Sequence, residues 1–303
     1  MNESRRCFLK QSIFAAAGTG AILTPHSSSF AIAPIQRGMG ARMKLSFAAY
    51  SYRKYLAEEK SMTMMDFLDE CAKLGLSASE PTSYYFPPDA NDDYFIQFKR
   101  KAFLLGLDIS GTAIGNTYTH PAGPERDKNL ALTKRWIDNA ALMGAPCIRI
   151  FAGTAPKGVS EEQARKNCVE TIQEACAYAA RRGVYLALEN HGGIVSDAKG
   201  MLAIVKAVES DWFGVNLDTG NFHTDDPYKD IAETAPYAVN VQVKVEMSNA
   251  AGKAIEPDFE RIVGMLGEAG YRGYVALEYE AKPEPKDAVP RYLERLHKII
   301  SKA

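Results

Sequence analysis

The chain has 303 residues, of which 46% are hydrophobic and 24% are charged, a composition typical of a globular protein with a large core. Its formal net charge of −1 provides no electrostatic footprint for nucleic acid or for an anionic membrane surface. Beyond the N-terminal segment, no run of about 18 apolar residues occurs. The sequence therefore predicts neither a nucleic-acid partner nor a membrane span, and it leaves a homo-oligomer open.

The N-terminus has the features of an export signal. Residues 4–10 read Ser-Arg-Arg-Cys-Phe-Leu-Lys, which matches the twin-arginine pattern Ser-Arg-Arg-x-Phe-Leu-Lys. A mildly apolar stretch follows at 13–23, and small residues at 29–33 offer cleavage sites. We therefore expect residues 1–33 to be a twin-arginine-type signal peptide and the protein to be periplasmic. A disordered basic N-terminus is the alternative.

Apolar runs alternate with helix-like segments eight times along the rest of the chain. We expect strands at 44–50, 78–80, 108–114, 147–151, 184–189, 213–218, 239–245 and 274–278. We expect helices at 63–75, 92–105, 127–143, 160–182, 196–208, a short one from 227, 258–270 and 287–300. Strands that alternate with such helices pair in parallel, and eight units close into a barrel. The sequence thus predicts an α/β fold, a single-domain (β/α)8 TIM barrel over residues 43–303.

Local patterns make finer predictions. Ser160 and Gln163 have the spacing of a capping box at the start of the fourth helix, and Asp92 is the expected N-cap of the second. The cysteines after the signal segment form no Cys-x-x-Cys pair. We interpret them as small buried hydrophobic residues, with a disulfide as the alternative. They are Cys71, Cys147, Cys168 and Cys176.

Polar residues lie at or near the ends of four consecutive strands in the second half of the chain. They are Glu189, Asp218, Gln242 and Glu278. Barrel enzymes build their active sites at the carboxyl ends of the strands, so these side chains should converge. Without a cation, three carboxylates and an amide would repel one another or stay unsatisfied. The pattern therefore predicts one divalent metal ion, Mn²⁺ or Mg²⁺, because every donor is an oxygen. The alternative is that the strands simply end in polar residues where they meet water.

Four segments, taken in order, resemble the sugar phosphate isomerase/epimerase family, the xylose-isomerase-like TIM barrels. They are 188–193 (Leu-Glu-Asn-His-Gly-Gly), 216–221 (Asn-Leu-Asp-Thr-Gly-Asn), 241–244 (Val-Gln-Val-Lys) and 276–278 (Ala-Leu-Glu). The resemblance covers about 44–300. It implies that Glu189, Asp218 and Glu278 bind one divalent ion. It also implies that Glu189 and Glu278 form an acid–base pair across a sugar carbon.

Two positions depart from the family pattern. The third ligand is usually histidine, and this chain has Gln242, whose amide oxygen can still coordinate. The resulting all-oxygen site favours Mn²⁺ or Mg²⁺ over zinc. Many relatives carry histidine three residues after the aspartate, where this chain has Asn221, with His223 two residues further on. We predict that Asn221 and His223 contact the substrate, and we leave open which of them replaces the missing histidine.

Further side chains should reach the same cavity, because residues two apart on a barrel strand face the same side. His191 is a candidate general base or substrate partner, or it orients a ligand. Lys244 is a candidate cation for a developing enolate, or it forms a salt bridge to a ligand carboxylate. Arg149, near the end of the fourth strand, either lines the site or pairs with an acid.

Two loop positions complete the predicted substrate site. Glu80 ends the second strand, immediately before a loop with aromatic residues at 84–86 that could stack on a sugar ring. His120 lies in the long loop after the third strand. We predict substrate contacts for both Glu80 and His120. The alternatives are loop packing for the aromatic residues and solvation for His120.

These features predict a metal-dependent isomerase or epimerase that moves a proton next to the carbonyl of a small carbohydrate. Two alternatives stay open: a lyase or hydrolase that acts on 3-keto glycosides by β-elimination, with His191 as the favoured base, and a non-catalytic sugar-binding barrel. An endonuclease for abasic DNA would need a basic groove, which the net charge disfavours. The chain has no dinucleotide-binding glycine motif, Walker loop or nucleophile elbow.

Overall fold

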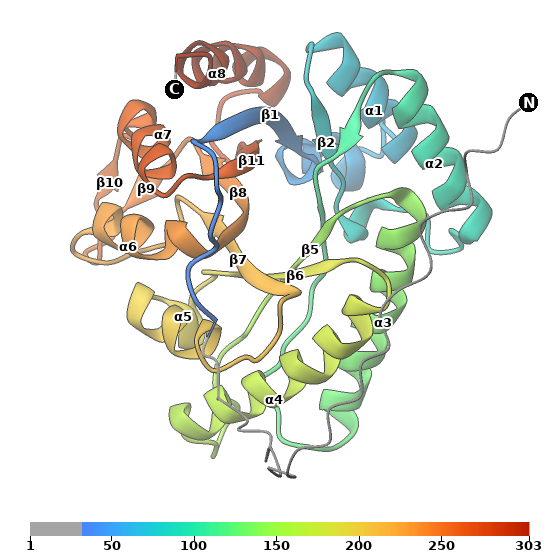
Figure 1. The fold of residues 1–303 in the computed structure, drawn as a ribbon. Helices are drawn as coiled ribbons and strands as arrows, with labels where there is room; N and C mark the ends of the chain where they lie inside the picture. Colours follow the sequence, from blue (N-terminus) through green and yellow to red (C-terminus); the bar gives the residue numbers. More distant parts are fainter. Residues whose placement is uncertain (1–31, 303) are drawn as a thin grey trace, which may run out of the picture.

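The computed structural model describes residues 32–302 (Figure 1). The predicted signal peptide therefore lies almost entirely outside the described residues. Within them, nine parallel strands form one sheet, in the order β3-β2-β1-β11-β8-β7-β6-β5-β4. The strands are β1 (Arg42–Ala48), β2 (Ala78–Glu80), β3 (Asp108–Ile109), β4 (Thr112–Ala113), β5 (Cys147–Ile150), β6 (Tyr185–Glu189), β7 (Phe213–Asp218), β8 (Ala238–Lys244) and β11 (Arg272–Glu278). The chain is a single-domain (β/α)8 barrel.

The third expected strand is interrupted, which is why the sheet has nine strands and not eight. β3 and β4 are its two halves, and Ser110 and Gly111 lie between them. The Ser110 backbone N–H and hydroxyl both donate to the Ser79 carbonyl of β2. A Cβ on Gly111 would lie 2.9 Å from the sulfur of Cys147, so only glycine fits this close approach to β5. The barrel closes through this short irregular segment.

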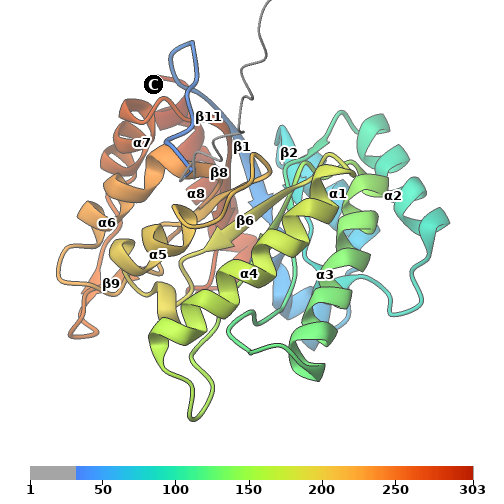
Figure 2. The ribbon, with the colours of Figure 1, turned by 60° about the horizontal axis from the view of Figure 1, so that its bottom comes forward.

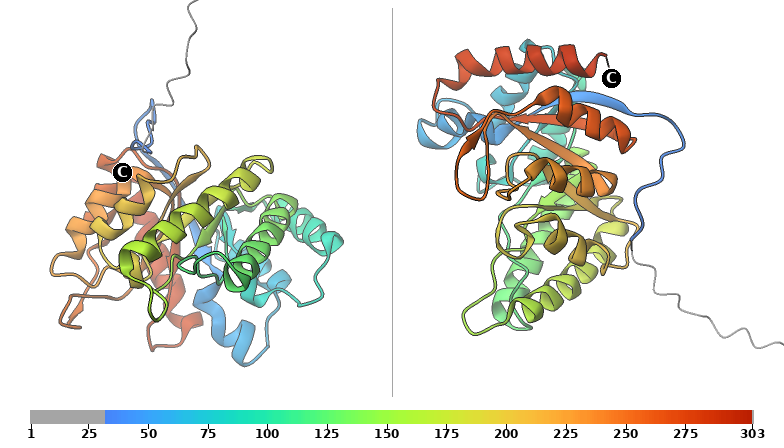
Figure 3. Two further views of the ribbon diagram at one scale, coloured as in Figure 1. Left: turned by 90° about the horizontal axis from the view of Figure 1, so that it is seen from below. Right: turned by 90° about the vertical axis from the view of Figure 1, so that its left-hand side faces the viewer.

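Helices surround the strands on the outside, as the views in Figures 2 and 3 show. They are α1 (Met64–Lys73), α2 (Asp92–Leu104), α3 (Pro124–Met143), α4 (Glu161–Ala180), α5 (Ala198–Val205), α6 (Pro227–Thr234), α7 (Phe259–Glu268) and α8 (Pro285–Ile300). None of the helices in residues 32–302 is long and apolar enough to cross a membrane.

The helix boundaries confirm some local predictions and correct others. Ser160 caps α4 by accepting a hydrogen bond from the Gln163 N–H, but the reciprocal half of the predicted capping box is absent, because the Gln163 side chain donates to Asn167 instead. Asn91, and not Asp92, caps α2, because its side chain accepts from the Tyr94 N–H. α3 begins three residues earlier than predicted, with Pro124 at its first turn, where a missing N–H costs nothing. A hairpin of β9 (Met247–Ser248) and β10 (Ala254–Ile255) was not predicted.

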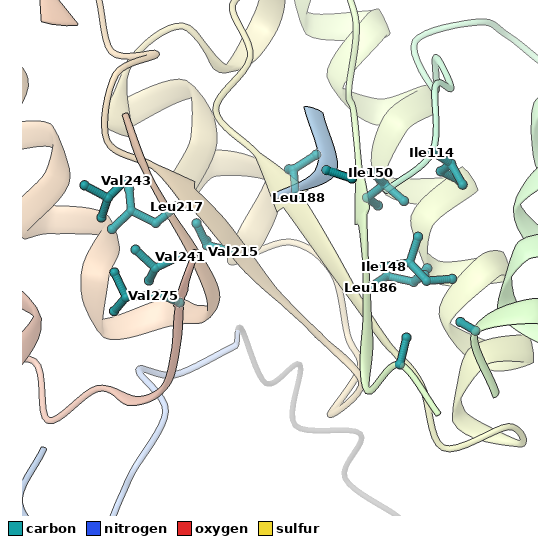
Figure 4. Packing of buried hydrophobic residues seen from close by; sticks show 14 of the residues in the cluster. Ile114, Ile148, Ile150, Leu186, Leu188, Val215, Leu217, Val241, Val243 and Val275 are labelled. Carbon is teal, nitrogen blue, oxygen red and sulfur yellow. The ribbon is translucent and has the colours of Figure 1, made fainter. Parts of the chain in front are cut away.

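The two faces of the strands differ in polarity. Alternate residues of β5 to β8 and β11 are buried and aliphatic, and they form the core seen in Figure 4. The residues between them, which share the opposite face, include most of the buried polar groups of these strands. Their cluster inside the barrel is described below. The four cysteines within residues 32–302 are buried and free, as predicted for small hydrophobic residues.

Candidate active site

The predicted strand-end residues lie on adjacent strands at matching register. Asp218 of β7 is paired with Gln242 of β8, and Glu278 of β11 is paired with Lys244 of β8. Glu189 at the end of β6 is paired with Asn216 of β7. The sheet thus brings the four predicted metal-binding positions to one end of the barrel. All four are buried, with 0–7% of each residue exposed.

Arg149 neutralises Glu189. Its Nε lies 2.8 Å from Glu189 Oε2, and one guanidinium nitrogen donates to the Ile114 carbonyl at 2.7 Å. The guanidinium also packs over the Phe151 ring, 3.8 Å from its centroid. Asn221 donates to the other carboxylate oxygen of Glu189 at 2.9 Å. Of the two interpretations of Arg149, pairing with an acid is therefore what the structure shows.

Lys244 lies between two carboxylates. Its Nζ is 3.4 Å from Asp218 Oδ2 and 3.2 Å from Glu280 Oε1. Asp218 Oδ1 accepts a hydrogen bond from the Gly220 N–H, but Oδ2 is buried and has no hydrogen-bond partner among the described residues. A Cβ on Gly220 would lie 2.7 Å from the Cβ of Lys244, so glycine permits the chain to pass the lysine. Lys244 thus forms the salt bridge of the second interpretation, and its role toward an enolate stays a prediction.

Gln242 belongs to a closed ring of hydrogen bonds with Glu80, Asn216 and Asn240. Glu80 accepts from Gln242 Nε2 at 2.5 Å and from Asn240 Nδ2 at 2.9 Å. Asn240 Nδ2 also donates to Asn216 Oδ1, and Asn216 Nδ2 donates to Gln242 Oε1, both at 2.7 Å. Neither Asn216 nor Asn240 was predicted as a site residue. Their signal was present, because each lies two residues before a predicted ligand and so faces the same side of its strand.

Burial dominates the protonation of the carboxylates. It raises the pKa of Glu189 to about 7, although the Arg149 charge opposes the shift. Burial likewise raises the pKa of Glu278 well above its usual range and that of Asp218 above its ordinary value, in both cases against the Lys244 charge. With Glu80 and Glu280, five carboxylates face two cations. The cluster therefore favours additional positive charge, as protons or as a metal ion.

The donor atoms fit a hard divalent cation. Three carboxylates and the amide oxygen of Gln242 are the oxygen ligands that Mn²⁺ and Mg²⁺ prefer. Asp218 Oδ2, which accepts no hydrogen bond from the described residues and faces the Lys244 charge, is a buried acceptor of the kind that a divalent cation would satisfy. In the structure, no three His, Cys, Asp or Glu side chains within residues 32–302 are arranged to bind a metal ion. The Lys244 ammonium group lies close to Asp218 instead. Binding would require the side chains to move together.

The three predicted histidines have different surroundings. His191 is exposed, and its ring lies 4.4 Å from the Phe151 ring. Partial desolvation lowers the pKa of His191, and the charges of Arg149 and Lys244 lower it further. His223 is exposed, with Nδ1 2.8 Å from the Ser248 hydroxyl of the β9–β10 hairpin. His120 is half-buried in the loop before α3 and has no hydrogen bond to the cluster in the described part of the chain.

A pocket of about 630 Å³ opens beside this cluster. Lys244, Glu280, Asn221 and His223 line it, and the β9–β10 hairpin forms its outer wall. The pocket combines these charged and neutral hydrogen-bonding groups with apolar side chains, among them Val245, Met247 and Ile255. Such a lining suits a hydroxylated ligand, because each hydroxyl group can both donate and accept hydrogen bonds.

Comparison with known proteins identifies the family. The model of the xylose isomerase-like TIM barrel family matches residues 68–299. The chain belongs to this family. The 2-oxo-tetronate isomerase of Haemophilus influenzae is 25% identical over 174 residues, which are 54% of this chain and 64% of that protein. The match thus spans less than two thirds of the relative's own length.

Solved structures of the family share the fold. A D-psicose 3-epimerase, crystallised in the presence of D-fructose, has a TM-score of 0.68 at 17% identity, and the match covers 86% of this chain and 97% of that one. The IOLI protein, crystallised with a bound zinc atom, has a TM-score of 0.70 at 16% identity, and the match covers 86% and 99%. Sugar epimerases and isomerases are therefore among the structural neighbours of this family member, and some neighbours hold a divalent metal.

Proposed function

We propose that this protein is a metal-dependent isomerase or epimerase that moves a proton on a carbon next to the carbonyl of a small carbohydrate. The observation that carries the proposal is the excess of negative charge at the carboxyl ends of the strands, where four buried carboxylates and the partly exposed Glu280 face two cations. Membership of the xylose isomerase-like family supports the isomerase class. The hydrogen-bonding side chains in the lining of the adjacent pocket, Asn221, His223, Lys244 and Glu280, support a carbohydrate as the substrate.

Glu189 and Glu278 are the proposed acid–base pair. In the sheet order, β6 and β11 lie on the two outer sides of β7 and β8, so the two glutamates reach the cluster from different sides. One glutamate removes the proton from the carbon next to the carbonyl, and the substrate becomes an enediolate. A proton returned from the other glutamate to the same carbon inverts it. A proton returned to the neighbouring carbon, together with passage of the hydroxyl proton from one enediolate oxygen to the other, interconverts an aldose and a ketose.

In this proposal, the remaining residues hold the metal ion, provide a positive charge and contact the substrate. Glu189, Asp218, Gln242 and Glu278 would hold the divalent ion, and the chemistry that such an ion supplies when bound is polarisation of the carbonyl. Lys244, with only 11% of its side chain exposed, provides a fixed positive charge near the developing negative oxygen. Asn221 and His223 line the pocket and are the proposed contacts to the sugar hydroxyl groups.

Proton–deuterium exchange tests the proposal directly. The purified protein, loaded with Mn²⁺ or Mg²⁺, is incubated in D₂O with a panel of ketoses, aldoses and 3-keto glycosides, and exchange is followed by NMR. For the Glu278→Gln variant we expect the exchange rate to fall by about 10²- to 10⁴-fold, because the variant lacks one proton-transferring group.

The matched control is Glu294→Gln, the same substitution on α8, where the side chain pairs with Lys298 at the surface. It should exchange substrate at the wild-type rate. Wild-type exchange in Glu278→Gln would remove this residue from the mechanism. If metal is bound and no compound exchanges, the proposed activity is wrong and a sugar-binding barrel becomes the better account.

A further inference from the structure

The four-membered hydrogen-bond ring leaves the Gln242 amide only one orientation. Both oxygens of Glu80 accept hydrogen bonds from amide N–H groups, one from Gln242 and one from Asn240. Gln242 therefore turns Nε2 to Glu80 and Oε1 to Asn216. A flipped amide would place oxygen against oxygen at Glu80 and nitrogen against nitrogen at Asn216. Both hydrogen bonds of Gln242 would then be lost.

Asn240 closes the ring and fixes its direction. Its two N–H groups donate to Glu80 Oε2 and to Asn216 Oδ1. Since Asn216 Oδ1 is used in this way, its amide nitrogen must point to Gln242. The orientation of all three amides thus follows from the two acceptor oxygens of Glu80. Such closed networks are more rigid than separate pairs.

Burial makes this orientation hard to change. Glu80 is 1% exposed, Asn216 0%, Asn240 3% and Gln242 4%. Water cannot replace a hydrogen bond lost at such positions. The ring also spans the barrel interior, because β1 and β11 lie between β2, which carries Glu80, and β8, which carries Asn240 and Gln242. The second strand therefore controls a side chain of the proposed metal site on β8.

We propose that Glu80 is a positioning residue, which acts through Asn240 and Asn216 to hold the amide oxygen of Gln242 as the fourth donor to the divalent ion. This inference rests on the proposed function. Oε1 accepts one hydrogen bond from Asn216 and retains a second lone pair, which can bind a cation. Oε1 of Gln242 points toward β7, the strand that carries Asp218, and away from Glu80. The ring thus lets glutamine occupy the position where the family pattern has histidine.

The test is the Glu80→Gln variant, which has nearly the same shape but only one oxygen to accept from two amide donors. We expect the Mn²⁺ dissociation constant, measured by electron paramagnetic resonance, to rise by about 10- to 100-fold. A second readout is the side-chain NH₂ signals of ¹⁵N-labelled protein. In the wild type, those of Asn216, Asn240 and Gln242 should exchange slowly with solvent, and in the variant this protection should be lost.

Ser110→Ala is the matched control. Ser110 is also buried, and its hydroxyl is 2.7 Å from that of Ser46, but it is not a member of the ring. The control should bind Mn²⁺ as the wild type does, with protected amides. If Glu80→Gln does not fold, Asn240→Ala removes the brace while Glu80 and Gln242 remain in place. It should also weaken Mn²⁺ binding.

The outcomes separate the two proposals. Wild-type Mn²⁺ affinity in Glu80→Gln, or an equal loss in Ser110→Ala, overturns the positioning role and leaves the proposed function intact. A wild-type protein that neither binds Mn²⁺ nor exchanges substrate protons overturns both. Weaker Mn²⁺ binding together with unprotected amides, in Glu80→Gln alone, supports the role of the ring.

Discussion

The two ends of the barrel each carry a lysine paired with an aspartate, but in opposite surroundings. At the carboxyl ends, Lys244 and Asp218 are 3.4 Å apart, with 11% and 0% of their side chains exposed. At the amino ends, Lys44 and Asp108 are 3.0 Å apart, with 41% and 63% exposed. Tyr274 hydrogen-bonds both members of the exposed pair. The exposed pair is thus the closer one and has the better hydrogen bonds.

The distance between the charged atoms does not indicate how much each ion pair contributes to stability. An exposed ion pair contributes little, because water and salt screen it. A buried pair has already lost its hydration, so the removal of one partner leaves a charge that nothing compensates. Lys244 also lies beside Glu280, and the charges of Glu278 and Glu189 help to raise its pKa. Lys44, in contrast, has one acidic partner. The longer pair should therefore have the larger effect on the protein.

Of the variants that test this comparison, Lys244→Met should have the largest effect on the stability of the protein. Because the variant leaves Asp218 and its neighbours without their cation, we expect the free energy of unfolding to fall by about 3–5 kcal/mol. Urea titration at pH 7 in the presence of a chelator measures it. The matched control is Lys44→Met at the exposed pair. Equal stability of the two variants would contradict the role of burial.

A smaller and more specific effect is the salt dependence of each pair. When ionic strength rises from about 0.01 M to about 1 M, the Debye length falls from about 30 Å to about 3 Å. We expect the coupling energy between Lys44 and Asp108 to approach zero, and that between Lys244 and Asp218 to persist. Double-mutant cycles with Asp108→Asn and Asp218→Asn give both energies. If added salt reduced both coupling energies equally, the Lys244–Asp218 pair would be hydrated as the exposed pair is.

The smallest expected effect is that of Lys44→Met itself. Since the pair is exposed, the free energy of unfolding should change by about 0–1 kcal/mol. Metal binding and proton exchange should stay at wild-type levels, because Lys44 lies at the end of β1 opposite to the proposed site. A loss of exchange in this variant would mean that the two ends of the barrel are coupled, which the structure gives no reason to expect.

Many residues of the candidate site were predicted from the sequence. Glu189, Asp218 and Glu278 end their strands as predicted, and Gln242 lies on β8 two residues from its end. The salt-bridge interpretations of Arg149 and Lys244 were correct but stood beside equal alternatives, since their partners lie on other strands. The substrate contacts predicted for Glu80, His120, Asn221 and His223 stay predictions. For Glu80 the structure adds two amide partners that no local pattern indicated.

The sequence by itself determined the order of the elements and the residues at the strand ends. These depend on local properties: alternation along a strand, helix caps, and glycine after a helix. Only the tertiary structure decided which groups meet. The contact of Glu80 with Gln242 crosses 162 residues, and the break at Ser110 and Gly111 depends on the approach of β2 and β5. Barrel closure sets such contacts, because it places strands that are distant in the sequence around one interior.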